Sequence, residues 1–211
     1  MVRIAVIGAN GGIGSKVVEL GLNKGFHITA IVRDPSRITI THPELEVVQC
    51  DILKKERIAG VLSGQDVIVS AIGSNSLKET VLYSKGVENI IASMQDNDVK
   101  RGLFVSASGL EVNPTHSFLI RFATKHILQR ILRNMYTDLT RMEAIIKRSN
   151  IDWTIVRPPR LTDQPVTGKY REAVNKILDN PKTISRANVA HYIVDHLMDA
   201  RIMKATVEIA D

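Results

Sequence analysis

The amino-acid sequence predicts a single α/β domain with a doubly wound, mostly parallel sheet and helices on both of its faces. Two observations predict it. Strand-like and helix-like stretches alternate along the chain, and the strand-like stretches are short, apolar and rich in β-branched residues. A chain of 211 residues buries one sizeable core but is too short for two ordinary domains. We therefore expect one domain over residues 1–211, in which residues 108–185 contribute a small pocket portion.

The first strand-like stretch, residues 2–7, leads into three evenly spaced glycines and then into a helix-like stretch at residues 15–24. Gly8 permits a tight exit from the strand, Gly11 lets a pyrophosphate approach the backbone, and Gly14 lets the helix pack close to the strand. The unpaired N–H groups at the start of the helix then face the phosphates. The pattern predicts a dinucleotide-binding Rossmann fold, and the alternative is a turn with a structural role alone.

The second strand, residues 26–32, is followed by Arg33, with Arg37 one turn further on. In such folds an acid at this position accepts hydrogen bonds from the ribose of NAD, whereas an arginine accommodates the 2′-phosphate of NADP. A guanidinium matches phosphate geometry with paired donors, so we expect NADP(H) to be preferred over NAD(H). Two alternatives stay open: the arginines are solvated loop charges, or Asp34 is the acid of an NAD site shifted by one residue.

The remaining pattern predicts strands at residues 45–49, 66–70, 102–106, 152–156 and 205–209, and helices at residues 54–62, 78–95, 136–149 and 186–200. Ligands of open α/β sheets lie beyond the carboxyl ends of the strands. The candidate positions therefore follow each strand, at residues 51–52, 71–74, 106–109 and 157–162. Asp51 either contacts an adenine, with Ile52 packed on its ring, or caps the helix near Lys54.

Residues 111–138 differ from the rest of the chain, because no acid lies between Glu111 and Asp138. Four basic residues alternate there with apolar ones, which predicts a basic amphipathic helix or helix pair. We expect its apolar side to pack on the sheet or in a dimer. The alternative is a helix on a membrane surface or in a partner's groove.

The composition limits the classes of partner and the cellular compartment that we expect for the protein. The net charge of +6 raises the possibility of nucleic acid, but the basic residues are mostly scattered and aromatic residues make up only 4% of the chain, so we do not expect nucleic-acid binding. No apolar stretch is long enough to span a membrane. The sole cysteine, Cys50, excludes an internal disulfide and is expected to be buried. A single cysteine fits a reducing compartment, and the first residues lack a signal-peptide pattern. Both observations indicate a cytoplasmic location.

Taken together, these residues resemble the atypical branch of the short-chain dehydrogenase/reductase superfamily, in particular its NmrA-like and biliverdin/flavin reductase B-like members. The resemblance covers nearly the whole chain. It is carried by residues 8–14 (GANGGIG), 32–35 (VRDP), 50–52 (CDI), 71–73 (AIG), 106–108 (SAS), 153–159 (WTIVRPP) and 163–168 (DQPVTG).

The resemblance implies an NADP cofactor and hydride transfer, with a role for each matching position. It places the pyrophosphate on Gly8, Asn10, Gly11, Gly12, Ile13 and Gly14, the 2′-phosphate on Arg33, and adenine on Asp51 and Ile52. It places the adenosine ribose on Ala71, Ile72 and Gly73, the nicotinamide on Ser106, Ala107 and Pro158, and the substrate against Ser108.

Two departures from the family pattern bear on the substrate. No tyrosine of the chain is followed four residues later by a lysine, the pair that protonates a carbonyl in most of the superfamily. Arg160 stands where flavin reductase B-like members carry a histidine, and an arginine holds an anion but donates no proton at neutral pH. We therefore expect a flavin, a quinone or a similar planar acceptor, with Ser108 and Arg160 on opposite walls of its pocket. The alternative is a non-catalytic NADP-binding regulator, and either a monomer or a homodimer is compatible with the sequence.

Overall fold

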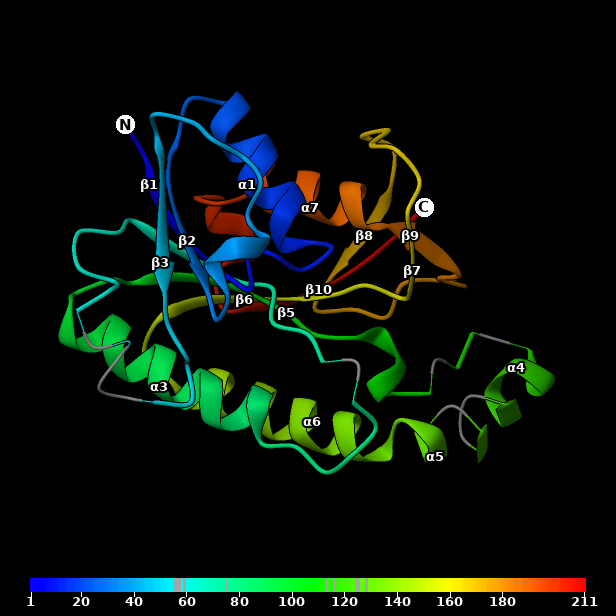
Figure 1. The fold of residues 1–211 in the computed structure, drawn as a ribbon. Helices are drawn as coiled ribbons and strands as arrows, with labels where there is room; N and C mark the ends of the chain where they lie inside the picture. The colour runs from blue at the N-terminus through cyan, green and yellow to red at the C-terminus, as the bar shows by residue number, and fades with distance from the viewer. Residues whose placement is uncertain are drawn as a thin grey trace.

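The protein is described from a computed structural model that covers residues 1–54, 58, 60–74, 76–112, 114–115, 117–123, 126–127 and 129–211, with the backbone alone for residues 118–120. Its centre is an eight-stranded sheet in the order β3-β2-β1-β4-β5-β6-β10-β8 (Figure 1). The strands are β1 (Arg3–Ile7), β2 (His27–Val32), β3 (Leu45–Gln49), β4 (Val67–Ser70), β5 (Arg101–Val105), β6 (Asp152–Arg157), β8 (Arg171–Val174) and β10 (Ala205–Ala210). Every pairing is parallel except that of β8 with β10. The expected doubly wound α/β fold is confirmed.

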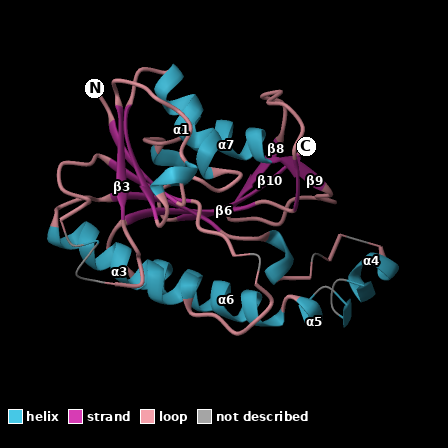
Figure 2. Ribbon diagram, in the orientation of Figure 1, coloured by secondary structure: helices cyan, strands magenta, loops and turns pink. Residues whose placement is uncertain are grey.

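Helices cover both faces of the sheet (Figure 2). One face carries α1 (Gly14–Asn23) and α7 (Arg186–Asp195), and the other carries α3 (Leu82–Asp96) and α6 (Arg133–Arg148). Each face has its own core: Val17, Val18, Val189 and Ile193 pack against Val6 and Val69 on one side, and Ile90, Met94, Met142 and Ile146 against Ile68 and Phe104 on the other. These buried side chains occupy the apolar positions that the sequence pattern predicted.

The order of the strands reverses between β1 and β4, which flank the glycine turn. Ile7 at the end of β1 pairs with Ile31 on one side and with Ser70 on the other, so the three strands end at the same level. The residues that follow are tied to this edge, because Gly8 N–H donates to the carbonyl of Ile31 at 3.1 Å and Ala71 N–H donates to that of Ile7 at 2.9 Å. The sheet therefore brings the ends of β2, β1 and β4 together around one crevice.

Some element boundaries differ from expectation. The helix expected from residue 78 begins at Leu82, because the Ser76 and Thr80 side chains accept hydrogen bonds from the N–H groups of Lys78 and Leu82 and so favour turns. The last helix ends at Asp195 rather than at residue 200. Most of the helix expected at residues 54–62 lies outside the described residues. The short strands β7 (Arg160–Thr162), β8 and β9 (Thr183–Ser185) were not predicted.

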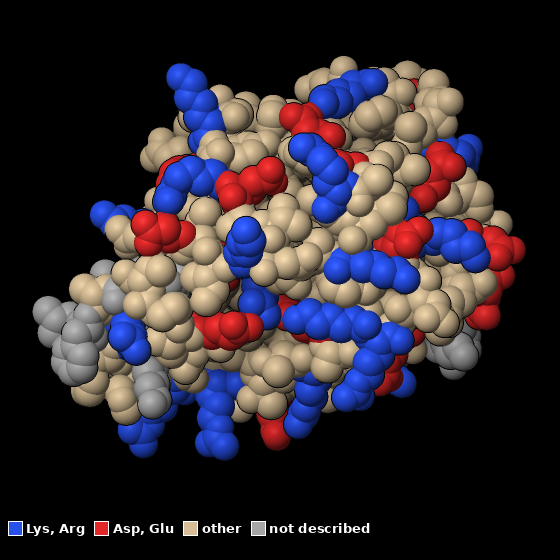
Figure 3. Space-filling model, turned by 180° about the vertical axis from the view of Figure 1, so that it is seen from behind, with Lys and Arg blue, Asp and Glu red and all other residues tan. Residues whose placement is uncertain are grey.

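The basic segment at residues 111–138 forms short helices, α4 (Phe118–Ala123) and α5 (Gln129–Ile131), before α6 begins. Phe122, Ile127 and Ile131 are 53%, 54% and 55% exposed. The packing on the sheet that we expected is therefore not observed for these three side chains. Elsewhere on the surface charges of both signs are interspersed, as Figure 3 shows for one face. Within the described part of the chain, we find no helix that combines the length and apolarity needed to cross a membrane.

Candidate functional site

A cavity of about 730 Å³ lies at the carboxyl edge of the sheet, over the point where the strand order reverses. Its wall includes most of the residues predicted for a dinucleotide. They are Gly8, Asn10, Gly11, Gly12, Ile13, Arg33, Arg37, Ile52, Ala71, Ile72, Gly73, Ser106 and Ala107. Gly14, Asp51, Pro158, Ser108 and Arg160 do not line it.

The glycine turn forms a cradle with open space above it. Gly8 has a positive φ of 79°, and a Cβ there would come within 2.7 Å of the Ala71 carbonyl oxygen. A Cβ on Gly14 would overlap the carbonyl oxygen of Gly8, which explains why that position is not in the wall but beneath it. A Cβ on Gly11 would have the Gly8 carbonyl oxygen as its nearest neighbour, at 3.1 Å. The start of α1 has no side-chain cap and no acid in its first turn. Ser15 N–H donates to the Gly11 carbonyl at 2.9 Å, so the remaining N–H groups of this turn are the ones left for an anion.

Arg186, the first residue of α7, adds a positive charge that the sequence did not reveal. A Cβ on Gly12 would lie 2.5 Å from Cδ of Arg186, so this side chain crosses directly over the glycine turn. Its Nη1 is 2.7 Å from Oδ1 of Asp163. The start of α7 is fixed by Ser185, whose hydroxyl accepts a hydrogen bond from Asn188 N–H at 2.9 Å.

The end of the cavity beside β2 carries Arg33 and Arg37, both exposed. Asp34 between them turns away from the cavity, and its Oδ1 accepts hydrogen bonds from the hydroxyl and the N–H of Ser36 at 2.7 and 3.2 Å. The hydroxyl of Ser36 is the main cause that lowers the pKa of Asp34. The carboxylate therefore serves as a local cap, while Arg33 and Arg37 line the cavity on either side of it in the chain.

Asp51 and Ile52, which we expected to border an adenine or to cap a helix, have different surroundings. Oδ1 of Asp51 accepts a hydrogen bond from Leu53 N–H at 3.1 Å, which is the geometry of a local cap. Ile52 lies in the cavity wall, and its carbonyl oxygen accepts from Nδ2 of Asn89 at 2.8 Å. Of the two residues, Ile52 lines the cavity and Asp51 does not.

At the opposite end of the cavity, Ser106 and Ala107 follow β5 and line the wall. Ser108 begins a short 3₁₀ turn just outside it, and its N–H donates to the carbonyl of Pro158 at 3.0 Å. Arg160 has an exposed side chain on β7, whereas the next residue, Leu161, lines the cavity. Because side chains alternate along a strand, the same register that brings Leu161 inward turns Arg160 away.

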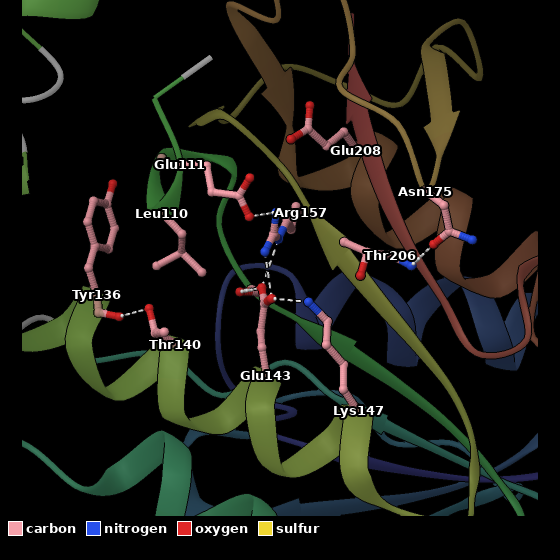
Figure 4. A network of polar contacts seen from close by, with 12 residues as sticks. Leu110, Glu111, Tyr136, Thr140, Glu143, Lys147, Arg157, Asn175, Thr206 and Glu208 are labelled. Atoms are coloured by element: carbon pink, nitrogen blue, oxygen red, sulfur yellow. Dashed lines mark hydrogen bonds and ion pairs between the residues drawn. The ribbon is translucent and has the colours of Figure 1, made fainter. Parts of the chain in front are cut away.

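Behind Ser106 lies a buried ionic network (Figure 4). The Ser106 hydroxyl donates to Oε1 of Glu143 at 2.7 Å. Arg157 grips the same carboxylate with Nε at 2.8 Å and Nη2 at 2.6 Å, and its Nη1 is 2.9 Å from Oε1 of Glu111. Lys147 adds a contact to Oε2 of Glu143 at 3.2 Å.

The network keeps the carboxylate of Glu143 ionised. Burial by itself would raise the pKa of this carboxyl, but hydrogen bonds from Arg157 and Ser106 and the nearby positive charges hold the pKa below its ordinary value. Burial likewise disfavours the charge of Arg157, yet its contacts with Glu143 and Glu111 raise the pKa of the guanidinium. Glu143 is thus an acceptor of hydrogen bonds at neutral pH and not a proton donor.

Two tyrosines near the cavity remain protonated phenols. Tyr83 lines the wall, and its hydroxyl oxygen accepts from Ser74 N–H at 3.0 Å. Tyr136 lies on α6 with its hydroxyl over Gly109 rather than in the cavity wall. Burial raises the pKa of both phenols. Among the residues that the structure describes, no group of three or more histidine, cysteine or acidic side chains could hold a metal ion.

The fold and the glycine cradle agree with the comparison to known proteins. The NAD(P)H-binding family matches residues 8–200 of the chain. The chain belongs to this family. An uncharacterized chloroplastic protein of Arabidopsis thaliana is 27% identical, over 98% of this chain and 76% of its own length. The uncharacterized protein YwnB of Bacillus subtilis is 23% identical, over 91% of this chain and 89% of its own length.

Solved structures show the same architecture. A short-chain dehydrogenase/reductase from Veillonella parvula, crystallised with NADP, superimposes with a TM-score of 0.84 at 19% identity, covering 100% of this chain and 94% of that one. A putative epimerase from Bacteroides thetaiotaomicron gives a TM-score of 0.82 at 24% identity, covering 99% and 96%. Both likenesses show the fold, which is the Rossmann architecture that the sequence predicted.

Membership of the NAD(P)H-binding family fits the glycine cradle, the start of α1 without a side-chain cap, and the arginines at the cavity. One cavity extends from the Arg33 end to the Ser106 end, and its volume is sufficient for an elongated ligand. The features that sequence patterns predicted are those next to strand ends. Arg186, Tyr83, Met135, Leu139 and Leu161, by contrast, enter the wall from other parts of the chain.

Proposed function

We propose that the protein is an NADPH-dependent oxidoreductase that transfers hydride to a flavin, a quinone or a similar planar acceptor. The observation that carries this proposal is that one cavity wall combines three features. They are a phosphate cradle, two arginines at one end and an apolar floor at the other end. The bound cofactor supplies the hydride, and the chain's own residues bind, orient and shield the reactants.

The binding roles follow from position. The glycine turn, the N–H groups of α1 and Arg186 would hold the pyrophosphate. Arg33 and Arg37 would hold the 2′-phosphate. Asp34 does not occupy the place of a ribose acceptor, because its carboxylate accepts the hydrogen bond from Ser36. This arrangement supports a preference for NADPH over NADH.

The acceptor end supports a planar substrate. Leu82, Met135, Leu139 and Leu161 supply apolar surface on which a flat ring packs and from which water is displaced. The described residues of the wall include no histidine, lysine or carboxylate to protonate a carbonyl. The one phenol among them, that of Tyr83, has a raised pKa and no lysine four residues later in the sequence that would lower it. Flavins and quinones accept hydride with less dependence on such a group. We retain Ser108 as a proposed substrate-facing hydroxyl next to the wall, but assign no role to Arg160.

The test is steady-state oxidation of NADPH with FMN and with a small quinone. We expect turnover with at least one acceptor, and a higher kcat/KM with NADPH than with NADH. Ser108→Ala should lower kcat, since its hydroxyl would orient or polarise the acceptor as the hydride arrives. Arg160→Ala serves as the matched control and should leave both constants unchanged.

A second candidate is a non-catalytic NADP-binding regulator. It is supported by the exposed Phe122, Ile127 and Ile131, which lie close in sequence to Arg121 and Arg130 and could contact a partner. Tight NADPH binding with no turnover on any acceptor would favour this candidate. For either function we propose a cytoplasmic location, supported by the single cysteine, and a monomer or homodimer that acts without nucleic acid.

A further inference from the structure

We propose that Glu143 is a positioning residue that commits the Ser106 hydroxyl to accept, and not to donate, a hydrogen bond within the cavity. The consequence is selection at the nicotinamide end of the cofactor for a carboxamide over a carboxylate. This inference rests on the proposed cofactor site and adds a specificity determinant to it.

The geometry fixes the direction of the hydrogen bond. Ser106 and Glu143 are both buried, and the hydroxyl of Ser106 lies 2.7 Å from Oε1 of Glu143. Two nitrogens of Arg157 hold the carboxylate from the other side, so the carboxylate cannot rotate freely (Figure 4). Bidentate contacts of this kind set both distance and orientation.

The charge state fixes which partner donates. Hydrogen bonds from Arg157 and Ser106 offset the effect of burial and keep the pKa of Glu143 low, so the carboxylate is ionised and only accepts. A hydroxyl has one hydrogen, and that of Ser106 is committed to Glu143. The lone pairs of the hydroxyl are what remains for a ligand, which must therefore present a donor.

The topology places this acceptor at one particular end of the ligand. Ser106 follows β5, whereas Arg33 follows β2, and β1 and β4 lie between these two strands. A dinucleotide whose 2′-phosphate lies at Arg33 and whose pyrophosphate lies at the glycine turn therefore directs its nicotinamide toward Ser106. The carboxamide of nicotinamide carries N–H donors, while the carboxylate of nicotinic acid carries none at neutral pH.

Desolvation strengthens the selection. A carboxylate placed at Ser106 would find no donor in that hydroxyl, because its hydrogen is committed to Glu143. An unsatisfied polar group in a desolvated site is disfavoured strongly compared with a satisfied one. We therefore expect the protein to bind NADP⁺ at least about tenfold more tightly than its nicotinic acid analogue.

The experiment measures dissociation constants by titration calorimetry for NADP⁺, the nicotinic acid analogue and 2′-phospho-ADP-ribose, which keeps adenine but lacks nicotinamide. In Ser106→Ala the ratio between the first two ligands should fall by about fivefold or more, while affinity for the fragment stays within about twofold. Glu143→Gln should act in the same direction, and the double variant should add little to Ser106→Ala. Glu88→Gln, which removes a surface carboxylate paired with Lys85, is the control and should change none of these values.

Each contrary result is distinct. An unchanged ratio in Ser106→Ala overturns the inference and leaves the proposed cofactor site intact. Equal losses for NADP⁺ and the fragment in Glu143→Gln, in a variant that remains folded, indicate a purely structural role and overturn it as well. If Glu143→Gln does not fold, Ser106→Ala alone decides. A wild-type protein that binds neither NADP⁺ nor the fragment overturns the proposed function together with the inference.

Discussion

Arg33 and Asp34 are neighbours in the chain but have different surroundings. Arg33 lines the cavity, whereas the carboxylate of Asp34 is bound to Ser36. A charge-assisted hydrogen bond to a phosphate contributes about 1.5–3 kcal/mol, which corresponds to a preference of tenfold or more. We expect Arg33→Ala to remove most of the preference for NADPH over NADH, measured as the ratio of dissociation constants.

Asp34→Ala is the matched control, and it should retain the preference because the side chain does not face the ligand. Equal affinities of the unmodified protein for NADPH and NADH would contradict this prediction.

Two glycines of the same turn are expected to respond differently to an added methyl group. On Gly11 a Cβ would lie 3.1 Å from the carbonyl oxygen of Gly8 and 3.8 Å from that of Ala71, and it would occupy the cradle. Gly11→Ala should therefore remain folded and bind NADPH at least about tenfold more weakly. On Gly14 a Cβ would overlap the backbone of Gly8, so Gly14→Ala should lose about 1–3 kcal/mol of stability. Thermal unfolding and calorimetric titration of both variants separate the effects, and unchanged NADPH affinity in Gly11→Ala would refute the cradle.

At the scale of elements, the start of α3 depends on a carboxylate from α6. Asp138 is fully buried, and its oxygens accept hydrogen bonds from Tyr83 N–H at 2.8 Å and from the hydroxyl of Ser84. Asp138→Ala would leave these buried donors without a partner, so we expect a loss of about 1–3 kcal/mol in the free energy of unfolding.

The same change should weaken NADPH binding, because Tyr83 at this helix start lines the cavity. Thr140→Ala, an exposed position on the same helix, is the control for both measurements. Equal unfolding free energies of Asp138→Ala and the unmodified protein would argue against this tertiary cap.

The central strands and the long helices could be predicted because their apolar positions recur with the correct period, as at Ile90 and Met94 of α3. β7 and β9 have three residues each, too few for a period to be recognised. β8 is short and carries charges at Arg171 and Glu172, so it resembles a loop in sequence. Hydrogen bonds from serine and threonine side chains moved the start of α3, and such local contacts leave no periodic signal.

Some residues of the candidate site could likewise be predicted from the sequence, and others could not. The glycine turn and Arg33 could be predicted because each directly follows a strand, and the topology of the sheet brings strand ends together. Arg186 could not, since its approach to Gly12 depends on how α7 packs beside α1. A weaker signal for the ionic network was present, because Arg157 ends an otherwise apolar strand and Glu143 lies on the apolar side of a helix.

At the scale of the whole molecule, Glu143 links stability to pH. Its pKa in the folded state lies below the ordinary value of 4.5, so its contribution is complete above that pH and is lost as the pH falls toward the folded pKa. Glu143→Gln should be less stable than the unmodified protein at pH 7, and this difference in unfolding free energy should shrink below about pH 4.5. Chemical denaturation at several pH values measures it.

Glu88→Gln, at an exposed ion pair, should show a small difference at every pH. A Glu143→Gln deficit that stays constant down to about pH 3 would mean that the carboxylate's charge is not what stabilises the fold.

The position of Cys50 gives the molecule its own reporter. It is the chain's one cysteine, is 1% exposed and lies in the wall of the cavity. A thiol-directed probe therefore marks a single place. Because this side chain is almost fully buried, labelling requires a transient opening of the cavity wall, which we expect a seated ligand to oppose. We expect NADPH to slow labelling in proportion to the fraction of occupied molecules, with Cys50→Ser as the blank, and a rate that ignores saturating NADPH would contradict this. The rate of labelling at this one sulfur would report the fraction of molecules with an occupied cavity, without an engineered label and without a reaction to follow.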